Sequence, residues 1–199
     1  MGSDGNKKGI YRFVKRGLDI LFSGTLIAFL AIPMLVIWVA VKIDTVGKGI
    51  FRQIRVGKNG KLFVCYKFRT MYESAPPCCP SSKLLDAERY ITPVGKFLRR
   101  TSLDELPQLF NVFKGDMSLV GPRPLVLAER DVHEGRRLNG VYRLRPGMTG
   151  LSQVSGRNSL SDSEKVTLDT EYLYEFGFIQ DAKIIARTFS KLLSDEEKG

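Results

Sequence analysis

The longest feature of the hydrophobic pattern is a run without charged side chains at residues 20–41. At 1.5 Å per residue, a helix over these residues is long enough for a hydrocarbon core of roughly 30 Å. Pro33 lies near the middle and removes a helical hydrogen bond, so we expect a kink or a break there. Either a kinked helix crosses the bilayer, or a broken helix enters and returns on one face. A buried core helix is the least favoured alternative, because the run has no polar face.

Basic side chains flank this run on both sides, with Lys15 and Arg16 before it and Lys42 and Lys48 after it. Positive charge tends to stay cytoplasmic, so similar charge on both sides is expected when both ends remain inside. Residues 7–19 space apolar side chains at helical intervals among basic ones. That pattern predicts an amphipathic helix suited to an anionic membrane surface.

Beyond residue 50 the hydrophobic period changes. Two short β-like runs on either side of the Lys58–Lys61 step predict a hairpin. Helical spacing predicts a short helix over 106–113 and longer ones over 161–176 and 181–193. Residues 73–83 carry three prolines and are expected to form a loop. The expected buried faces of the two longer helices are Leu168, Tyr172 and Leu173 in the first, and Ala182, Ile185, Ala186, Phe189 and Leu193 in the second.

Composition narrows the class of protein. The chain of 199 residues is long enough for one domain with a core, and we find no internal repeat. A net charge of +10 favours an anionic partner. Cys65, Cys78 and Cys79 suggest neither a disulfide framework nor a zinc site, which fits a reducing compartment. His133 is the single histidine, which excludes His-cluster metal sites, and we expect it on the solvated surface.

Two adjacent carboxylates, Asp104 and Glu105, are the main chemical candidates. Ser102-Leu-Asp-Glu105 matches a capping box, and Thr101 offers an overlapping cap. Pro107 disfavours helix at the residue before it and is comfortable only in a first turn. Whether Ser102 or Thr101 is the cap, the pair lies beside a helix N-terminus, where negative charge is favoured by about 0.3–1 kcal/mol. Most isolated matches of this kind are only caps.

The functional alternative uses the same position. An ionised carboxylate can attack phosphorus or bind Mg²⁺, and phosphoryl transfer needs cations that offset spread negative charge. Basic residues in nearby segments could supply them. The pattern suits a diphosphate substrate better than a nucleic-acid duplex, because few basic residues form a continuous stripe. The candidate cations are Lys67, Arg69, Arg123, Arg145 and Arg157.

Several ordered motifs, together spanning about residues 11–193, resemble the bacterial sugar transferases known as small monotopic phosphoglycosyl transferases. The resemblance implies that a phosphosugar moves from a UDP-sugar to polyprenyl phosphate, usually undecaprenyl phosphate, with release of UMP. It also implies Mg²⁺ and a covalent aspartyl-phosphosugar intermediate, with Asp104 as the nucleophile and Glu105 in acid–base chemistry or metal binding. The motifs are KRGLD (15–19), YKFRTM (66–71), TPVGKFLRRTSLDELPQLFNVFKGDMSLVGPRP (92–124), RLRPGMTGLSQVSGRN (143–158) and LDTEYL (168–173).

The resemblance also implies substrate-binding residues and a fold. The fold is α+β and mostly helical, with a re-entrant membrane helix broken at Pro33, amphipathic interfacial helices and a small β-hairpin. Many relatives have serine before this proline, whereas this chain has Ile32. Together with the candidate cations, the substrate-binding set is Lys67, Arg69, Arg99, Arg123, Arg145, Gln153, Arg157, Asn158, Asp169 and Tyr172, and the metal ligands are Asp104 and Glu105.

The expected organisation is a tag or disordered segment at 1–9, a membrane-associated helical segment at 10–49, and a cytoplasmic catalytic domain at 50–199. The expected location is the cytoplasmic face of the bacterial inner membrane, where the lipid bilayer, UDP-sugar and polyprenyl phosphate are the partners and nucleic acid is not. The sugar, the pathway and the oligomeric state, a homo-oligomer included, stay open. A nucleotide-diphosphate hydrolase and a basic membrane or nucleic-acid adaptor are the rival hypotheses.

Overall fold

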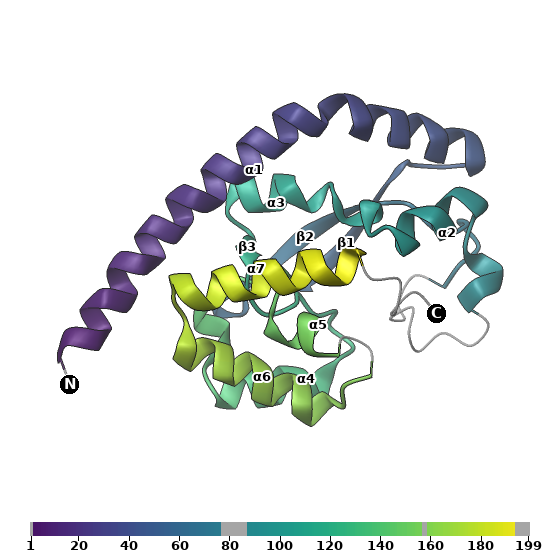
Figure 1. The fold of residues 1–199 in the computed structure, drawn as a ribbon. Helices are drawn as coiled ribbons and strands as arrows, with labels where there is room; N and C mark the ends of the chain where they lie inside the picture. The colour runs from purple at the N-terminus through teal and green to yellow at the C-terminus, as the bar shows by residue number, and fades with distance from the viewer. Residues whose placement is uncertain (1, 77–86, 157–158, 194–199) are drawn as a thin grey trace.

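The computed structural model describes residues 2–76, 87–156 and 159–193, and it confirms a mostly helical α+β fold (Figure 1). The helices are α1 (Gly2–Asp44), α2 (Pro93–Arg100), α3 (Gln108–Lys114), α4 (Arg130–Leu138), α5 (Leu151–Ser155), α6 (Asp162–Glu175) and α7 (Phe178–Leu193). The strands are β1 (Ile50–Val56), β2 (Leu62–Phe68), β3 (Ser118–Val120) and β4 (Gly147–Thr149). Short 3-10 turns are η1 (Lys58–Gly60), η3 (Ala87–Tyr90), η4 (Leu103–Glu105) and η5 (Val141–Arg143).

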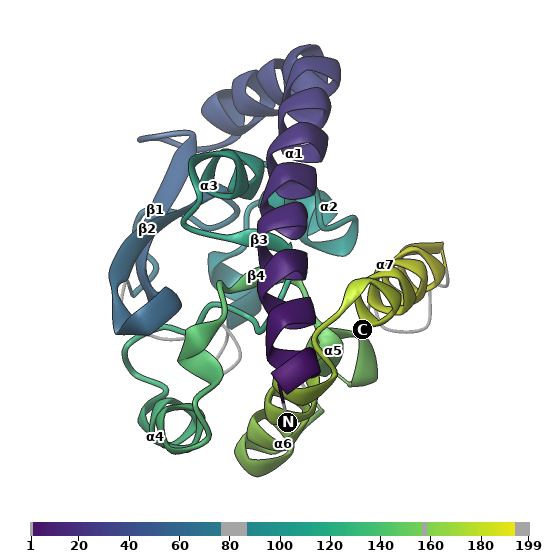
Figure 2. The ribbon, with the colours of Figure 1, turned by 90° about the vertical axis from the view of Figure 1, so that its left-hand side faces the viewer.

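Helix α1 arches over the rest of the molecule (Figures 1 and 2). It stays helical through Pro33 and bends in the half that contains this proline, so of the two expected outcomes, a kink or a break, the structure shows the kink. A proline removes one helical hydrogen bond and can bend a helix whose other bonds persist. The helix also includes residues 2–9, part of the segment 1–9 that was expected to be a tag or disordered. Extending a formed helix adds a hydrogen bond per residue.

Both ends of the apolar part of α1 are attached to the same globular body. At its start, the Asp19 carboxylate accepts hydrogen bonds from Ser118 Oγ at 3.1 Å and from Leu119 N at 3.0 Å. At its end, the Asp44 carboxylate accepts from Val94 N at 3.1 Å, at the start of α2. The chain therefore returns to the body from which the apolar run departs.

Strands β1 and β2 form the predicted antiparallel hairpin around η1. The turn requires left-handed backbone at Asn59 (φ 56°) and Gly60 (φ 74°), which asparagine and glycine tolerate well. Side chains alternate between the two faces of the hairpin. One face carries Gln53, Arg55, Cys65 and Lys67. On this face, Cys65 is buried in a core cluster with Val112 and Met117.

A second, parallel pair brings together two glycine-rich loops, since Ser118 lies opposite Gly147 and Val120 opposite Thr149. A Cβ atom on Gly147 would lie 2.1 Å from the nitrogen of Gly121, so this approach requires glycine. The loop that begins at Gly121 is thereby held against the segment leading to α5.

Helices α6 and α7 cover one side of a core that includes Val120, Tyr172 and Ile184. The buried face predicted for α6 is confirmed, because Tyr172 is buried while Leu168 and Leu173 pack against the core. The face predicted for α7 is wrong. Its inward side carries Asp181, Ile184 and Thr188. Ala182, Ile185, Ala186 and Phe189 are exposed, and the side chain of Leu193 lies outside the described ones.

Candidate active site

The acidic pair lies in turn η4, immediately before α3. The expected capping box does not form there, because Ser102 adopts left-handed backbone (φ 56°, ψ 15°) and its side chain makes no capping hydrogen bond. Asp104 is buried, with 9% of its surface exposed. The predicted position beside a helix start is confirmed, and the carboxylates are used in contacts distant in the sequence.

Lys67, from the middle of the hairpin face, reaches both carboxylates. Its Nζ donates a hydrogen bond to Glu105 Oε1 at 2.6 Å and lies 3.7 Å from Asp104 Oδ2. Arg123 approaches the same oxygen, with Nη1 3.9 Å from Glu105 Oε1. Two cations from separate elements therefore converge on Glu105, and one of them, Lys67, also lies near Asp104.

The relative placement of these elements is fixed by buried polar contacts. Asn111 on α3 is fully buried; its Nδ2 donates to Val64 O at 2.7 Å, and its Oδ1 accepts from Tyr66 N at 3.1 Å. Arg16 on α1 donates to the carbonyls of Val112 and Phe113 at the end of α3, at 2.7 and 2.9 Å. The acidic turn is thus anchored to both the hairpin and the long helix.

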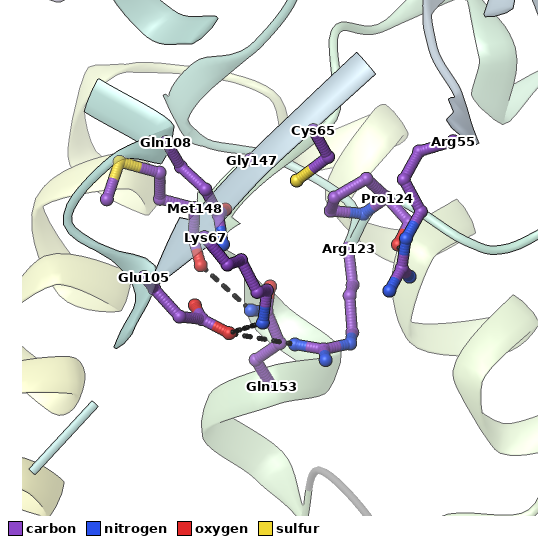
Figure 3. Close-up of a pocket in the computed structure, with 10 residues that line it drawn as sticks. All are labelled: Arg55, Cys65, Lys67, Glu105, Gln108, Arg123, Pro124, Gly147, Met148 and Gln153. Carbon is purple, nitrogen blue, oxygen red and sulfur yellow. Dashed lines mark hydrogen bonds and ion pairs between the residues drawn. The ribbon is translucent and has the colours of Figure 1, made fainter. Parts of the chain in front are cut away.

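Glu105, Lys67 and Arg123 border a small open pocket (Figure 3), and Asp104 lies beside it, within 3.7 Å of the Lys67 ammonium. Figure 3 shows Lys67 and Arg123 converging on Glu105, with Arg55 lying beyond Arg123. Gln153, at the wall of the pocket, donates from Nε2 to Met148 O at 2.9 Å, while its buried Oε1 has no hydrogen-bond partner. The lining residues are Arg55, Cys65, Lys67, Glu105, Gln108, Arg123, Pro124, Gly147, Met148 and Gln153.

The pocket is strongly basic on the hairpin side. Burial, reinforced by the charge of Arg123, lowers the pKa of Arg55. Burial raises the pKa of the Cys65 thiol, although Lys67 and Arg55 oppose that shift. Cys65 therefore stays a neutral packing residue at the pocket floor. Arg55 is a site residue that the sequence did not indicate. The signal that could have found it is the alternation of side chains between the two faces of the hairpin, which puts Arg55 of β1 on the same face as Cys65 and Lys67 of β2.

Three predicted substrate-binding arginines lie outside this pocket lining. Arg99 Nε donates to Thr70 Oγ1 at 2.8 Å, and burial lowers its pKa while nearby Asp104 opposes the shift. Arg69 Nη1 donates to Val46 O at 3.2 Å. Arg145 Nε donates to Gly115 O at 2.9 Å. Arg99 therefore has an electrostatic link to the acidic pair.

Asp169 and Tyr172 are buried in the scaffold behind the pocket. Asp169 accepts from Arg136 Nε at 2.8 Å and from Ser152 Oγ at 3.0 Å, and Arg136 Nη1 also donates to Arg123 O at 2.8 Å. Tyr172 donates from its hydroxyl to Asp181 at 2.6 Å. Asp169 therefore supports the loop that presents Arg123, and Tyr172 joins α6 to α7. Arg157 and Asn158 lie outside the described residues.

Asp104 and Glu105 are the side chains at this site that could hold Mg²⁺. The described part of the chain has no group of three or more His, Cys, Asp or Glu side chains arranged to hold a metal ion. Mg²⁺ is commonly bound through one or two carboxylates together with substrate phosphates and water. Asp104 and Glu105 fit this arrangement, in which the two carboxylates supply part of the coordination and the substrate phosphates supply the rest.

Comparison with known proteins gives one consistent result. Residues 10–195 match the family described as "Bacterial sugar transferase". The chain is 42% identical, over 92% of its length, to an undecaprenyl-phosphate galactose phosphotransferase of Salmonella typhimurium. It is 39% identical, over 92% of its length, to an uncharacterized sugar transferase of Haemophilus influenzae. It is 37% identical, over 92% of its length, to a UDP-glucose:undecaprenyl-phosphate glucose-1-phosphate transferase of Caulobacter vibrioides.

The matched lengths differ among these relatives. The chain spans 41% of the Salmonella and Haemophilus proteins and 70% of the Caulobacter protein. The similarity therefore covers nearly all of this chain but less than half of two of the relatives.

Proposed function

Because the chain belongs to the bacterial sugar transferase family, we propose that it transfers a sugar 1-phosphate from a UDP-sugar to polyprenyl phosphate, with release of UMP. The named relatives act on undecaprenyl phosphate, which is the proposed acceptor here. The product is a polyprenyl-diphosphate-sugar, the first membrane-bound intermediate of a surface glycan.

One observation carries the proposal: Lys67 contacts two adjacent carboxylates, and one of them, Glu105, lines a pocket to which separate elements bring cations. A diphosphate carries charge that such cations offset, and a carboxylate among them can act as the nucleophile. Lys67 lies close enough to Asp104 and Glu105 to stabilise a phosphate beside either carboxylate.

In the first proposed step, an Asp104 oxygen attacks the phosphorus that carries the sugar. A bond forms between that oxygen and phosphorus, and the bond to the bridging oxygen breaks. The electron pair moves to the bridging oxygen, which leaves as part of the UMP phosphate. Lys67 and Arg123 offset the negative charge on the transferring group, so the step needs no proton from the protein.

In the second proposed step, an oxygen of polyprenyl phosphate attacks the same phosphorus. The bond between phosphorus and Asp104 breaks, and its electron pair restores the carboxylate. The role proposed for Glu105 is to hold Lys67 in place through their 2.6 Å contact and, with Asp104, to bind Mg²⁺. When bound, Mg²⁺ would add positive charge at the substrate phosphates.

The exposed apolar surface supports a membrane location for this chemistry. In α1, Phe29, Ile32 and Ile43 are 75–83% exposed. A soluble protein rarely exposes so much contiguous apolar surface. With both ends of the apolar run held by one body, we propose that α1 enters the cytoplasmic leaflet of the inner membrane and returns.

Helix α7 supports the same placement. Phe178, Ile185 and Phe189 form an exposed apolar stripe, and the exposed basic residues Lys183 and Arg187 lie toward the opposite side of the helix. Aromatic and aliphatic residues on one face with basic residues on the other are typical of a helix that lies in an anionic membrane interface. Single cysteines at positions 6 and 58, in a background without the native cysteines, should be labelled from one side of sealed vesicles. Labelling from opposite sides would reject re-entry.

The chemical proposal is tested by intact-protein mass after incubation with UDP-sugar and Mg²⁺ and no lipid acceptor. The expected mass increase is that of one sugar phosphate, located on Asp104 by peptide mapping. Asp104→Asn should abolish both the adduct and product formation. If product forms at the normal rate without any adduct, the two-step mechanism is wrong.

The same incubation separates transfer from hydrolysis. A transferase without acceptor should release about one equivalent of UMP per protein and then stop, whereas a hydrolase releases sugar phosphate continuously. Adding polyprenyl phosphate should restore turnover, and chelating Mg²⁺ should prevent it. Continuous release without acceptor would favour the hydrolase.

A further inference from the structure

Arg55 is a largely buried cation whose hydrogen-bond partners carry no charge. Its Nη1 donates to Pro124 O at 2.8 Å, and its Nε and Nη2 donate to Gln53 Oε1 at 3.1 and 2.5 Å. Among the described residues, the ion pairs at the pocket involve Lys67 and Arg123 and do not include Arg55. A buried charge is normally paired, so Arg55 is a cation with which a bound anion could pair.

The charged neighbours of Arg55 have both signs, since Glu129 and Glu105 oppose the lowering of its pKa while Arg123 contributes to it. Arg123 lies on the same pocket wall, and its charge adds to the burial that lowers the pKa of Arg55. A guanidinium stays protonated at neutral pH even when its pKa falls, so the two positive charges repel each other. A bound anion would relieve this repulsion and the cost of burial together.

The position of Arg55 along the hairpin distinguishes it from Lys67. Lys67 lies opposite Phe51 and Arg55 lies opposite Phe63 on the same face, about 13 Å apart along the strands. Phe68, next to Lys67, packs in one cluster with Met34 and Val41 of α1.

The end of the hairpin that carries Arg55 is attached to the segment that contains Leu125. Val56, next to Arg55, donates a backbone hydrogen bond to Leu125 O at 3.2 Å. Lys67 is therefore at the end of the pocket near the apolar helix, and Arg55 is at the end remote from it. In the proposed membrane placement, a lipid-borne phosphate would approach from the first end and leave the second to a water-soluble nucleotide.

We propose that Arg55 binds the nucleotide phosphate of the donor, the one that leaves as UMP. This inference rests on the proposed function and assigns a subsite within it. The attacked phosphate lies by Lys67 and Asp104, while the leaving phosphate lies toward Arg55 and Arg123. When the phosphorus–oxygen bond breaks, its electron pair stays on the leaving phosphate, and Arg55 stabilises the charge that collects there.

The test measures binding of UMP to the full chain in detergent micelles or lipid nanodiscs. Arg55→Gln should weaken UMP binding by about tenfold to a hundredfold, the range expected when a charged hydrogen bond is lost. The matched control is Arg52→Gln, because Arg52 is on the same strand but on the opposite face, over the Tyr66 ring. The control should bind UMP as the unmodified protein does.

A second arm uses polyprenyl phosphate, which presents the same phosphate chemistry from the lipid. Its binding should be unchanged in Arg55→Gln. A loss confined to polyprenyl phosphate would overturn the assignment in favour of the acceptor. Equal UMP binding by Arg55→Gln and Arg52→Gln would overturn it in favour of a packing role.

A milder variant covers the case in which Arg55→Gln does not fold. Arg55→Lys keeps the charge but loses the planar fork, so UMP binding should weaken by a few fold relative to Arg52→Lys. No difference between these lysine variants would also overturn the assignment. UMP binding does not require turnover: if the unmodified protein binds UMP through Arg55 but forms no product, the proposed function fails separately.

Discussion

In the part of the chain that the structure describes, two stretches share the pattern S-x-x-E, at Ser102–Glu105 and Ser161–Glu164, and only the second forms a helix cap. At the start of α6, Glu164 N donates to Ser161 Oγ at 3.3 Å, and Ser161 N donates to Glu164 Oε2 at 2.7 Å. In η4, Ser102 makes no capping bond, and Glu105 accepts from Lys67.

The difference is one of available partners. Glu164 is exposed to solvent, so its best partner is the backbone of its own first turn. Glu105 has 14% of its side chain exposed and meets a lysine that is 38 residues away in the sequence. A short local pattern therefore predicts a cap only where no tertiary partner competes for the carboxylate.

Lys67 is expected to give the largest effect, because it reaches both carboxylates of the first stretch. Lys67→Met should lower kcat/KM by about 10²–10³-fold, as expected when a charge stabiliser is removed from an active site. The second stretch provides a matched control in Lys165→Met, since Lys165 Nζ lies 2.8 Å from Asp162. The control should keep full transferase activity. Equal losses in the two variants, measured as UMP release, would mean that Lys67 has no special role.

The glutamates give the next largest difference. Glu105→Gln removes the charge that holds Lys67, so we expect the turnover rate to fall by about tenfold to a hundredfold. Glu164→Gln should leave turnover unchanged, because its contacts are within α6. Single-turnover rates with UDP-sugar separate the two variants, and circular dichroism confirms that both remain folded. A normal rate in Glu105→Gln would remove this residue from the proposed machinery.

Local signals predicted the elements well. The Asn-Gly step of the hairpin and the spacing of Leu168 and Tyr172 both depend on near neighbours, and both predictions are confirmed. The apolar stripe of α7 was also real, but periodicity says only that a stripe exists and not what covers it. The hydrophobic pattern alone therefore could not predict that this stripe is exposed. His133 was expected in solvent, yet it is half-buried and bonded to Val126 O at 2.9 Å.

The site was only partly predictable, for a different reason. Lys67 and Arg123 were expected from the basic segments near the acidic pair, and Gln153 from the resemblance; all three line the pocket with Glu105, and Lys67 also reaches Asp104. The same reasoning selected Arg145, whose guanidinium instead binds a carbonyl at the end of α3. Arg55 was missed because its link to Arg123 depends on how the hairpin meets a loop nearly 70 residues later.

Removing the Ser161 cap at the start of α6 should have a smaller effect, and only on stability. Ser161→Ala removes the side-chain acceptor at the start of α6 and should lower the free energy of unfolding by about 1 kcal/mol. For a chain of this size that corresponds to roughly 2–4 °C in the midpoint of thermal unfolding. Transferase activity at 25 °C should not change. A loss of activity without loss of stability would show that α6 has a direct part in the reaction.

The corresponding change in the first stretch should have the smallest effect. Ser102 makes no capping bond, so Ser102→Ala should alter the free energy of unfolding by less than about 0.5 kcal/mol. Ser102→Gly should instead stabilise the protein slightly, because φ is 56° there and glycine adopts left-handed backbone without a steric penalty. Denaturant unfolding of these variants beside Ser161→Ala measures the contrast directly. A loss of about 1 kcal/mol in Ser102→Ala would mean that this serine caps the chain in solution, and that the two stretches differ less than their geometry indicates.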